Sequence, residues 1–474
     1  MRSVISRIPD MYRALALGVV LFFLGLASVG LAQSDNTTEL SLDQAQQLAL
    51  NALRTGNPGL AIEVSKGMLR ADPRDPQAYY IIALSHARLK QPNLARRAAA
   101  FSYRYSDTET ARFQAAQLAA RMAYEEGKPT LAQVWLRRTA VYASSERDAV
   151  LVARDYQALR TINPWSFRLR TDLRPSNNVN NGADNALQII DGVPVTGTLS
   201  GTARALSGVI GSLDVATAYR LHADARSSTS LGARLYLQRV GLSGAAKDLA
   251  PRAQNSDFAS TYAEVSLRHG FAVGATENGG SATVELALGE SWYGGQRSYR
   301  FGRIKAERRW FLTEGRTELV MKAVAENRAK ARFRSNTAQI LGFGGEVFHK
   351  LGNGDTLGVT IALRDSQADY HNGSFSSASM RTSYTFAKPV GPAKLSAGLV
   401  LGYSDYPVFR SGIFLVPGGR QDKSIYGDLS LFFDRYDYAG FAPILRLRTG
   451  RKSSNDSRFD TRELSVSLSV QSKF

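Results

Sequence analysis

The sequence predicts an α + β membrane protein: an N-terminal α-solenoid followed by a 14-stranded antiparallel transmembrane β-barrel. Three observations predict this fold. Alanines recur at a helical-repeat spacing in the first third of the chain. The hydrophobic period then changes from about 3.6 residues to two. The last strand alternates strictly and ends at Phe474. We expect an export signal over residues 1–32, a helical domain over 33–162 and a barrel over 163–474.

The composition excludes several kinds of site. The 474 residues include no cysteine, which rules out disulfides, thiol nucleophiles, CxxC sites and a lipidation cysteine. A hydrophobic content of 44% suits a membrane barrel, because only every second strand residue faces lipid. The net charge of +18 comes from basic residues spread along the chain, with no basic block interleaved with aromatics. This pattern favours a solvated surface, and we expect no nucleic-acid partner.

The N-terminus has the pattern of an export signal. Arg2, Arg7 and Arg13 precede an apolar run over residues 14–31, and Gly30-Leu31-Ala32 offers small residues for cleavage. The apolar run is long for a cleaved signal, so an uncleaved anchor is the alternative. No later window of about 18 apolar residues predicts another membrane-spanning helix.

The first domain repeats as pairs of helices. Three pairs of alanines are each separated by twelve residues; the first two pairs are offset by 34 residues and the third comes three residues late. Small residues at this spacing are typical of tetratricopeptide helix pairs, although alanine or isoleucine fills most of the family's aromatic positions. The predicted repeat-packing residues are Ala49, Ala61, Ala83, Ala95, Ala120 and Ala132.

Turn signals support the repeat. Pro73, Gln91-Pro92-Asn93 and Gly127-Lys128-Pro129 lie between predicted helices, and a helix from Glu146 to Arg160 would cap the stack. Stacks of this kind present a concave surface to a protein or peptide and carry no catalytic machinery of their own.

Beyond Asn163-Pro164-Trp165 the chain alternates with a period of two. In the last segment Leu464, Val466, Leu468 and Val470 share one face with Phe474, and mostly polar residues occupy the other. Similar segments include 231–238, 263–268, 318–326, 357–363 and 429–433.

About fourteen such segments follow at a spacing of roughly 22 residues, which suits strand plus turn in a membrane barrel. Turn signals at 277–280, 352–355 and 391–392 separate them, and aromatics gather near the predicted strand ends. A soluble β-sandwich is the alternative, but it needs no terminal aromatic. A barrel must close because unpaired backbone groups are costly in lipid.

Catalytic and cofactor motifs are missing. None of the five histidines (His86, His222, His269, His349 and His371) lies at metal-ligand spacing from another. Gly342–Gly345 falls inside a strand pattern and not before a helix, so it does not predict a phosphate loop. Barrel enzymes with Ser/His or Asp/His pairs exist, so the fold alone does not exclude catalysis. We nevertheless expect no enzyme, no cofactor and no metal.

Charged residues line the predicted inner face. On the first barrel strand Arg168, Arg170, Asp172 and Arg174 alternate with mostly apolar residues, and on the thirteenth Arg446 and Arg448 point the same way. A barrel of this size has a lumen wider than its side chains fill. These lumen-facing arginines indicate passage of a cargo, although solvation or pairing across the bore also explains each one.

Three stretches together resemble the surface lipoprotein assembly modifier family. They are the asparagine-rich segment after the first strand, the segment from Gly440 to Leu447, and the Ser454-Asn455-Asp456 turn, all behind a tetratricopeptide-like domain. The resemblance covers nearly the whole mature chain. Its motif residues here are Asn177, Asn178, Asn180, Asn181, Pro443, Ser454, Asn455 and Asp456.

The resemblance implies a translocator in the outer membrane with its helical domain in the periplasm. Its partners would be a client surface lipoprotein or related secreted protein, a periplasmic chaperone and outer-membrane lipid. As in outer-membrane proteins generally, the strand with Val470 and Phe474 would be read by the barrel assembly machinery. The rivals are an outer-membrane polysaccharide exporter, which also joins helical repeats to a barrel, and a plain diffusion porin.

Overall fold

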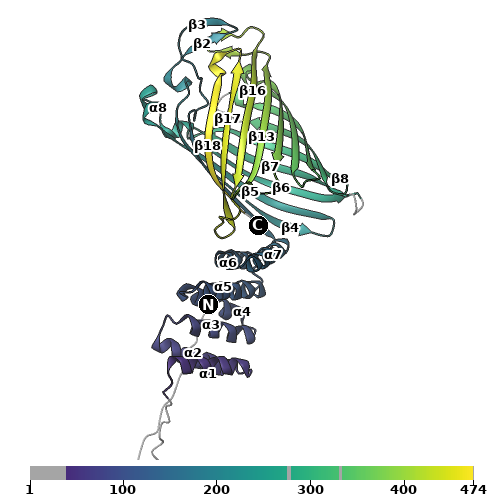
Figure 1. The fold of residues 1–474 in the computed structure, drawn as a ribbon. Coiled ribbons are helices and arrows are strands. Elements are labelled where there is room, and N and C mark those ends of the chain that lie inside the picture. The colour runs from purple at the N-terminus through teal and green to yellow at the C-terminus, as the bar shows by residue number, and fades with distance from the viewer. Residues whose placement is uncertain (1–38, 275–278, 330–333, 473–474) are drawn as a thin grey trace, which may run out of the picture.

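The computed structural model describes residues 39–274, 279–329 and 334–472. Seven consecutive helices over described residues 39–162 precede the barrel (Figure 1). The expected export signal and Phe474 lie outside the described residues. In the described part of the chain, no helix is both long and apolar enough to cross a membrane. The helices are α1 (Leu42–Arg54), α2 (Pro58–Ala71), α3 (Pro76–Arg88), α4 (Pro92–Tyr105), α5 (Glu109–Glu125), α6 (Pro129–Val141) and α7 (Glu146–Ile162).

Local sequence sets where these helices begin. A proline occupies the first turn of α2, α3, α4 and α6, where its missing N–H costs no hydrogen bond. The side chains of Ser41, Thr108 and Ser145 accept backbone N–H groups at the starts of α1, α5 and α7. Left-handed residues at Gly56, Lys90 and Gly127 follow three helices and turn the chain back on itself.

Small residues hold the helices close together. All six alanines of the predicted repeat are buried, none more than 4% exposed. They lie in cores shared by successive helices, with Trp135 and Met122 filling the larger spaces around α5 and α6. Replacing any of these methyl groups by a larger side chain would force neighbouring helices apart, because close-packed interiors have no spare volume.

The remaining chain forms one closed antiparallel barrel of fourteen strands, in the order β1-β18-β17-β16-β13-β12-β11-β10-β9-β8-β7-β6-β5-β4. The first and last barrel strands close it, with Thr171 opposite Val470 and Ser176 opposite Ser465. The predicted fold class is therefore confirmed. The barrel strands are β1 (Trp165–Ser176), β4 (Gly208–Ala223), β5 (Ser227–Leu242), β6 (Ser260–Val273), β7 (Gly280–Tyr293), β8 (Gln296–Leu312), β9 (Thr317–Ala329), β10 (Ala338–Lys350), β11 (Thr356–Ala368), β12 (Phe375–Thr385), β13 (Lys394–Tyr406), β16 (Arg420–Phe432), β17 (Phe441–Ser454) and β18 (Thr461–Ser472).

Alternation gives the barrel an apolar outside and a polar inside. On β18 the outward Leu464 and Leu468 are 65% and 54% exposed, while the inward Ser465 and Ser467 are buried. An outward band of leucine, valine and isoleucine recurs on the other strands. Such a band needs hydrocarbon to cover it, and a sealed sheet leaves no unpaired backbone edge in lipid. The barrel is thus an outer-membrane structure.

The two ends of the barrel differ. At the end next to the helices (the helix-side end), the strands are joined by short turns such as 224–226 and 313–316. At the opposite, loop-side end, longer connections carry small elements (Figure 1). These are the hairpin β2 (Leu187–Ile190) and β3 (Val193–Thr198), helix α8 (Gly244–Leu249), and the hairpin β14 (Arg410–Ser411) and β15 (Phe414–Leu415).

A buried asparagine joins the helical domain to the first strand. The Asn163 side chain, 3% exposed, donates to Gln133 Oε1 (2.7 Å) and accepts from Thr130 Oγ1 (3.2 Å) and the Trp165 N–H (3.0 Å). From β4, Arg220 donates to the Asn163 carbonyl at 2.8 Å and to the Thr161 carbonyl at 2.7 Å. These contacts fix the exit direction of α7 into β1.

A second junction, the Arg137 clasp, holds α6 against the helix-side ends of β17 and β18. The Arg137 guanidinium donates to the Ala439 carbonyl and to Ser472 Oγ, both at 2.9 Å, and to the Tyr156 hydroxyl at 3.0 Å. It also lies 4.4 Å from the centre of the Phe441 ring, within cation–π range. The helical stack is therefore tied to the barrel at two separate places on its rim.

Candidate functional site: a helical groove and a charged lumen

The helical domain carries a groove of about 570 Å³ on the face formed by α3, α5 and α7. Tyr80 and Leu84 from α3, Tyr124 from α5 and Leu159 from α7 give it an apolar floor. Tyr124 is 48% exposed although it is aromatic. The helices that line it are the first members of successive helix pairs, which form the concave side of a solenoid.

Polar groups at the groove could hold a backbone. The amides of Gln114 and Gln117 on α5 line it beside Arg121, and Asp155 faces them from α7. Burial raises the pKa of Tyr80 despite the opposing charge of Arg121, so its hydroxyl stays protonated and able to donate. Apolar contacts with interspersed amide donors and acceptors suit an extended peptide more than a small charged solute.

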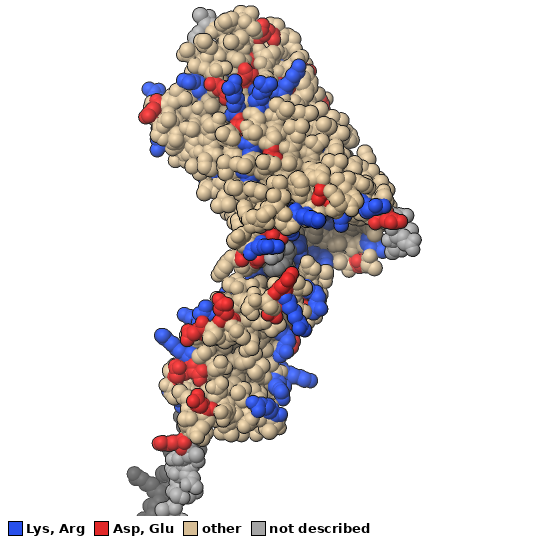
Figure 2. Space-filling model, in the orientation of Figure 1, with Lys and Arg blue, Asp and Glu red and all other residues tan. Residues whose placement is uncertain are grey.

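The groove ends where the barrel begins. Its last lining residue, Ile162, closes α7 and is 54% exposed. Three residues later Trp165 starts β1 and packs on Tyr219 of β4, with ring centroids 4.9 Å apart. Basic side chains gather at this junction of helices and barrel (Figure 2). The end of the groove at Ile162 and the helix-side opening of the barrel at Trp165 are therefore only three residues apart in the chain.

Inside the barrel, the structure places all five sequence-predicted arginines on the lumen side. Arg174 and Arg448 both approach the Glu463 carboxylate, at 3.7 Å and 3.3 Å. Arg168, Arg170 and Arg446 have no carboxylate within 4.0 Å among the described residues. Four of these arginines, all except Arg168, line a cavity of about 480 Å³ together with Asp172, Asp214 and serines of β18.

On the lumen wall formed by β6 to β9, most basic side chains pair with glutamates; Arg268 is an exception, with no carboxylate within 4.0 Å among the described residues. Arg303 is 12% exposed and lies within 4.0 Å of carboxylates on three strands, from Glu264, Glu285 and Glu326. Lys305 also pairs with Glu285, at 3.3 Å. The lumen lining is therefore asymmetric in charge: the wall around Arg303 is largely ion-paired, and the wall of β1 and β17 carries arginines with no direct ion pair.

The asparagine-rich segment has a structural role at the loop-side end. Asn178 brackets Gly182, donating to its carbonyl and accepting its N–H, both at 2.8 Å. Asn180 donates to the Arg204 carbonyl at 2.7 Å and accepts from the Leu206 N–H at 2.9 Å. Asn177 donates to the Arg462 carbonyl on β18, and Asn181 has a left-handed φ of 54°. These side chains replace backbone pairing in the loop between β1 and β4.

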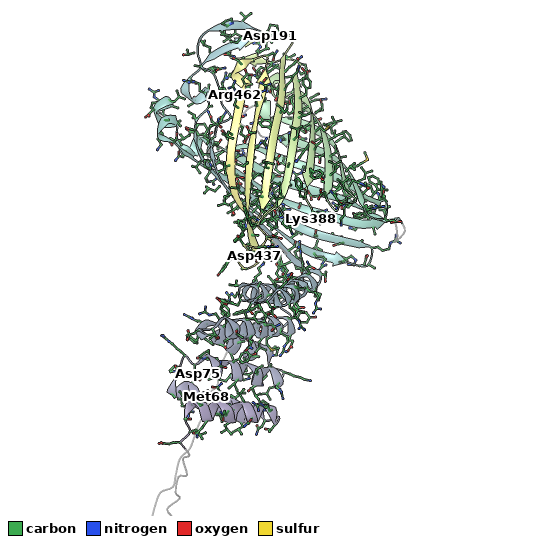
Figure 3. The ribbon with its side chains drawn as sticks, in the orientation of Figure 1. Met68, Asp75, Asp191, Lys388, Asp437 and Arg462 are labelled. Carbon is green, nitrogen blue, oxygen red and sulfur yellow. The ribbon has the colours of Figure 1, made fainter. Side chains whose placement is uncertain are left out.

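The Ser454-Asn455-Asp456 turn lies at the same end and ties the hairpins down. Asn455 donates to Asp191 Oδ1 at 3.0 Å and to the Gly419 carbonyl at 2.9 Å. Asp456 is fully buried and accepts from Gln188 at 2.9 Å, and the Ser454 N–H bonds to Asp460 at 2.7 Å. Figure 3 places Asp191 at this end and Asp437 beside the helices.

Pro443, the remaining family-motif residue, and Val470 of the predicted barrel-assembly signal lie near the helix-side end. Pro443 lies near the helix-side start of β17, where its carbonyl accepts from the Phe433 N–H at 3.0 Å. Val470 faces outward on β18, 38% exposed, directly opposite Pro443 and Thr171. The family-motif residues thus divide between the two ends of the barrel.

Several key residues escaped the sequence reasoning. Arg420 is buried, and its guanidinium lies 3.7 Å from the Tyr406 ring centre, 4.3 Å from Phe409 and 3.8 Å from Phe459. Arg137 and Arg303 were likewise unmarked. The partners of these three arginines lie tens to hundreds of positions away in the sequence. No short-range spacing pattern could therefore predict the contacts. No group of three or more metal-ligating residues occurs in the residues that the structure describes.

Neither a protein-family model nor a curated protein matches the sequence. Among solved structures, the type III secretion translocator chaperone SycD of Yersinia enterocolitica is similar to 26% of this chain over 88% of its own, at 18% identity and a TM-score of 0.24. An outer membrane channel from Pseudomonas putida F1 matches 64% of this chain over 94% of its own, at 11% identity and a TM-score of 0.32.

A bacterial polysaccharide outer membrane secretin matches 65% of this chain over 98% of its own, at 10% identity and a TM-score of 0.31. At these TM-scores none of the three likenesses carries an argument about what this chain transports.

Proposed function

We propose that this protein is an outer-membrane translocator that moves polypeptides from the periplasm to the cell surface. The observation that supports this proposal most directly is that the groove of the helical domain ends on α7, which leads directly into β1 of the barrel. The Arg137 clasp and the Asn163 contacts keep this alignment. A diffusion porin would have no use for such a groove.

The resemblance to surface lipoprotein assembly modifiers makes the client a surface lipoprotein or a related secreted protein. On this proposal the client arrives unfolded, alone or with a periplasmic chaperone, and its extended chain binds the groove of the helical domain. It then enters the barrel, and folding outside prevents its return. No nucleotide-binding motif occurs in the sequence, so the proposed driving force is folding on the far side.

The groove provides the test. We expect Tyr124→Glu, which buries a charge under any bound apolar side chain, to reduce surface display of a co-expressed client lipoprotein at least about tenfold. Display is measured by antibody labelling of intact cells, with the total amounts of client and translocator measured in the same cells.

Val150→Glu is the matched control, because Val150 is 61% exposed on α7 and does not line the groove. Normal display by Tyr124→Glu, or equal loss by both variants, would contradict the proposal. A polysaccharide exporter is the second candidate, favoured by the basic lumen; capsule or exopolysaccharide lost from cells lacking the gene, with client display unchanged, would establish it.

A further inference from the structure

Three lumen arginines make no direct ion pair among the described residues. The carboxylates close to them pair with other arginines: Asp214, opposite Arg170, pairs with Arg234, and Asp428 pairs with Arg381. Arg168 and Arg170 on β1 and Arg446 on β17 are exposed to the lumen, with no carboxylate within 4.0 Å among the described residues. Between these strands lies β18, whose inward side chains are hydroxyls from Ser465 and Ser467. We call this surface the β1–β17 arginine track. Unpaired guanidinium groups beside hydroxyl donors can hold anionic oxygens.

The β6–β9 wall of the lumen differs from the track, because most of its basic side chains pair with glutamates. On the β6–β9 wall, Arg303 is enclosed by three glutamates, and Lys322 pairs with Glu346 at 2.6 Å. Those charges are already satisfied and have little attraction left for a ligand. An anionic cargo would therefore be drawn to the side of β1 and β17, the side on which the helical groove arrives at Trp165.

The lumen aromatics favour a polypeptide over a glycan as the cargo. Three lumen tyrosines have an arginine guanidinium over the ring: Tyr426 beneath Arg448 at 4.5 Å, Tyr299 beneath Arg328 at 4.2 Å, and Tyr262 beneath Arg234 at 5.8 Å. Sugar rings bind proteins by stacking on open aromatic faces, and an arginine covers one face of each of these three rings; Tyr236, which lines the cavity beside the track, is not covered in this way among the described residues. Carboxylate side chains of a peptide need only the guanidinium and hydroxyl donors that the track offers.

We propose that the β1–β17 arginine track binds acidic segments of the extended polypeptide in transit. This inference rests on the proposed function and adds the chemistry that the lumen selects. Arg168 lies three residues inside β1, so it meets a chain leaving the groove first, and Arg170 follows one strand step further in. Each contact is solvated and weak, so a series of them can guide a chain without trapping it.

Direct binding to the full-length protein in detergent tests the track. The probe is a fluorescein-labelled deca-glutamate peptide, followed by anisotropy, with deca-lysine as the opposite-charge peptide. We expect deca-glutamate to bind, deca-lysine not to bind, and the double variant Arg168→Glu/Arg170→Glu to bind deca-glutamate about tenfold more weakly, because two contacts are lost and two repulsions gained.

The matched control reverses two other unpaired lumen charges, Arg268→Glu on β6 and Lys350→Glu on β10, also toward the helix-side end. It makes the same change in net charge away from the track, and we expect less than about threefold weakening at physiological salt. Folding of both variants is checked by the heat-dependent gel mobility of the barrel.

Three outcomes would overturn the inference: no binding of deca-glutamate to the unmodified protein, equal weakening by both double variants, or displacement of the peptide by an oligouronate of equal charge at lower concentration than by unlabelled deca-glutamate. Client display separates the two proposals. Display that falls with Tyr124→Glu but is normal with Arg168→Glu/Arg170→Glu would reject the track and keep the translocator.

Discussion

The buried carboxylate of Glu126 is held by one partner from helix α4 and one from the adjacent turn. Its side chain, 5% exposed, lies after α5 and pairs with Arg96 of α4 and with Lys128 at 2.7 Å. Burial alone would raise the pKa of the Glu126 carboxyl, but the hydrogen bonds and charges of Arg96 and Lys128 outweigh it and hold the pKa below its ordinary value.

This shift predicts acid sensitivity of the helical domain. The stabilisation is present above the unfolded-state pKa of about 4.3 and is lost as the pH falls through the lower folded pKa. We expect Glu126→Gln to lower stability at neutral pH by about 1–3 kcal/mol and to flatten the loss of helical circular dichroism in acid. Glu63→Gln, at a pair on the surface of α2, is the control; an identical response from both variants would be inconsistent with this account.

The Arg137 clasp makes a prediction about domain geometry. Arg137→Ala removes three donor contacts and the stacking on Phe441, so we expect the helical stack to pivot about Asn163. Because the chain has no cysteine, spin labels on two introduced cysteines, one in α4 and one in a helix-side turn, report that distance alone. The distance distribution should broaden in Arg137→Ala and not in Arg147→Ala; an unchanged distribution would rule out the clasp.

At the scale of elements, the sequence predicted the regular parts of the fold. Alternation with a period of two is a property of each strand, so the inward position of Arg168 and the outward position of Leu468 follow from counting residues. The repeat alanines were visible for the same reason, since helix contacts recur at fixed spacing. Hairpins β2–β3 and β14–β15 were not predicted, because they are held by side chains from a third loop.

That third loop predicts how the hairpins are fixed. Asn455 joins the β2–β3 turn, the segment before β16 and the start of β16 itself, through Asp191, Gly419 and the Gln421 N–H. We expect Asn455→Ala to cost about 1–3 kcal/mol locally and to speed protease cleavage within residues 187–198 of the folded protein. Asn353→Ala, at a helix-side turn, is the control, and equal cleavage rates in all three proteins would refute the role.

At the scale of the whole molecule, the helical groove and the arginine track of the lumen follow each other along the chain. The groove formed by α3, α5 and α7 leads to β1, and β1 carries the first arginines of the track. The self-neutralised wall around Arg303 lies on other strands. Sequence could place each arginine on an inner face, but it could not show which of them lack a partner, since pairing depends on strand order around the barrel.

The Arg137 clasp has a consequence for the order in which the protein matures. The helices are synthesised before the barrel, yet the clasp contacts Ala439, just before β17, and Ser472, at the end of β18, the last barrel strand in chain order. The stack can be locked over the entrance only after the final strand is seated. While the barrel is incomplete, the helical stack is therefore not yet held in its final position on the barrel rim.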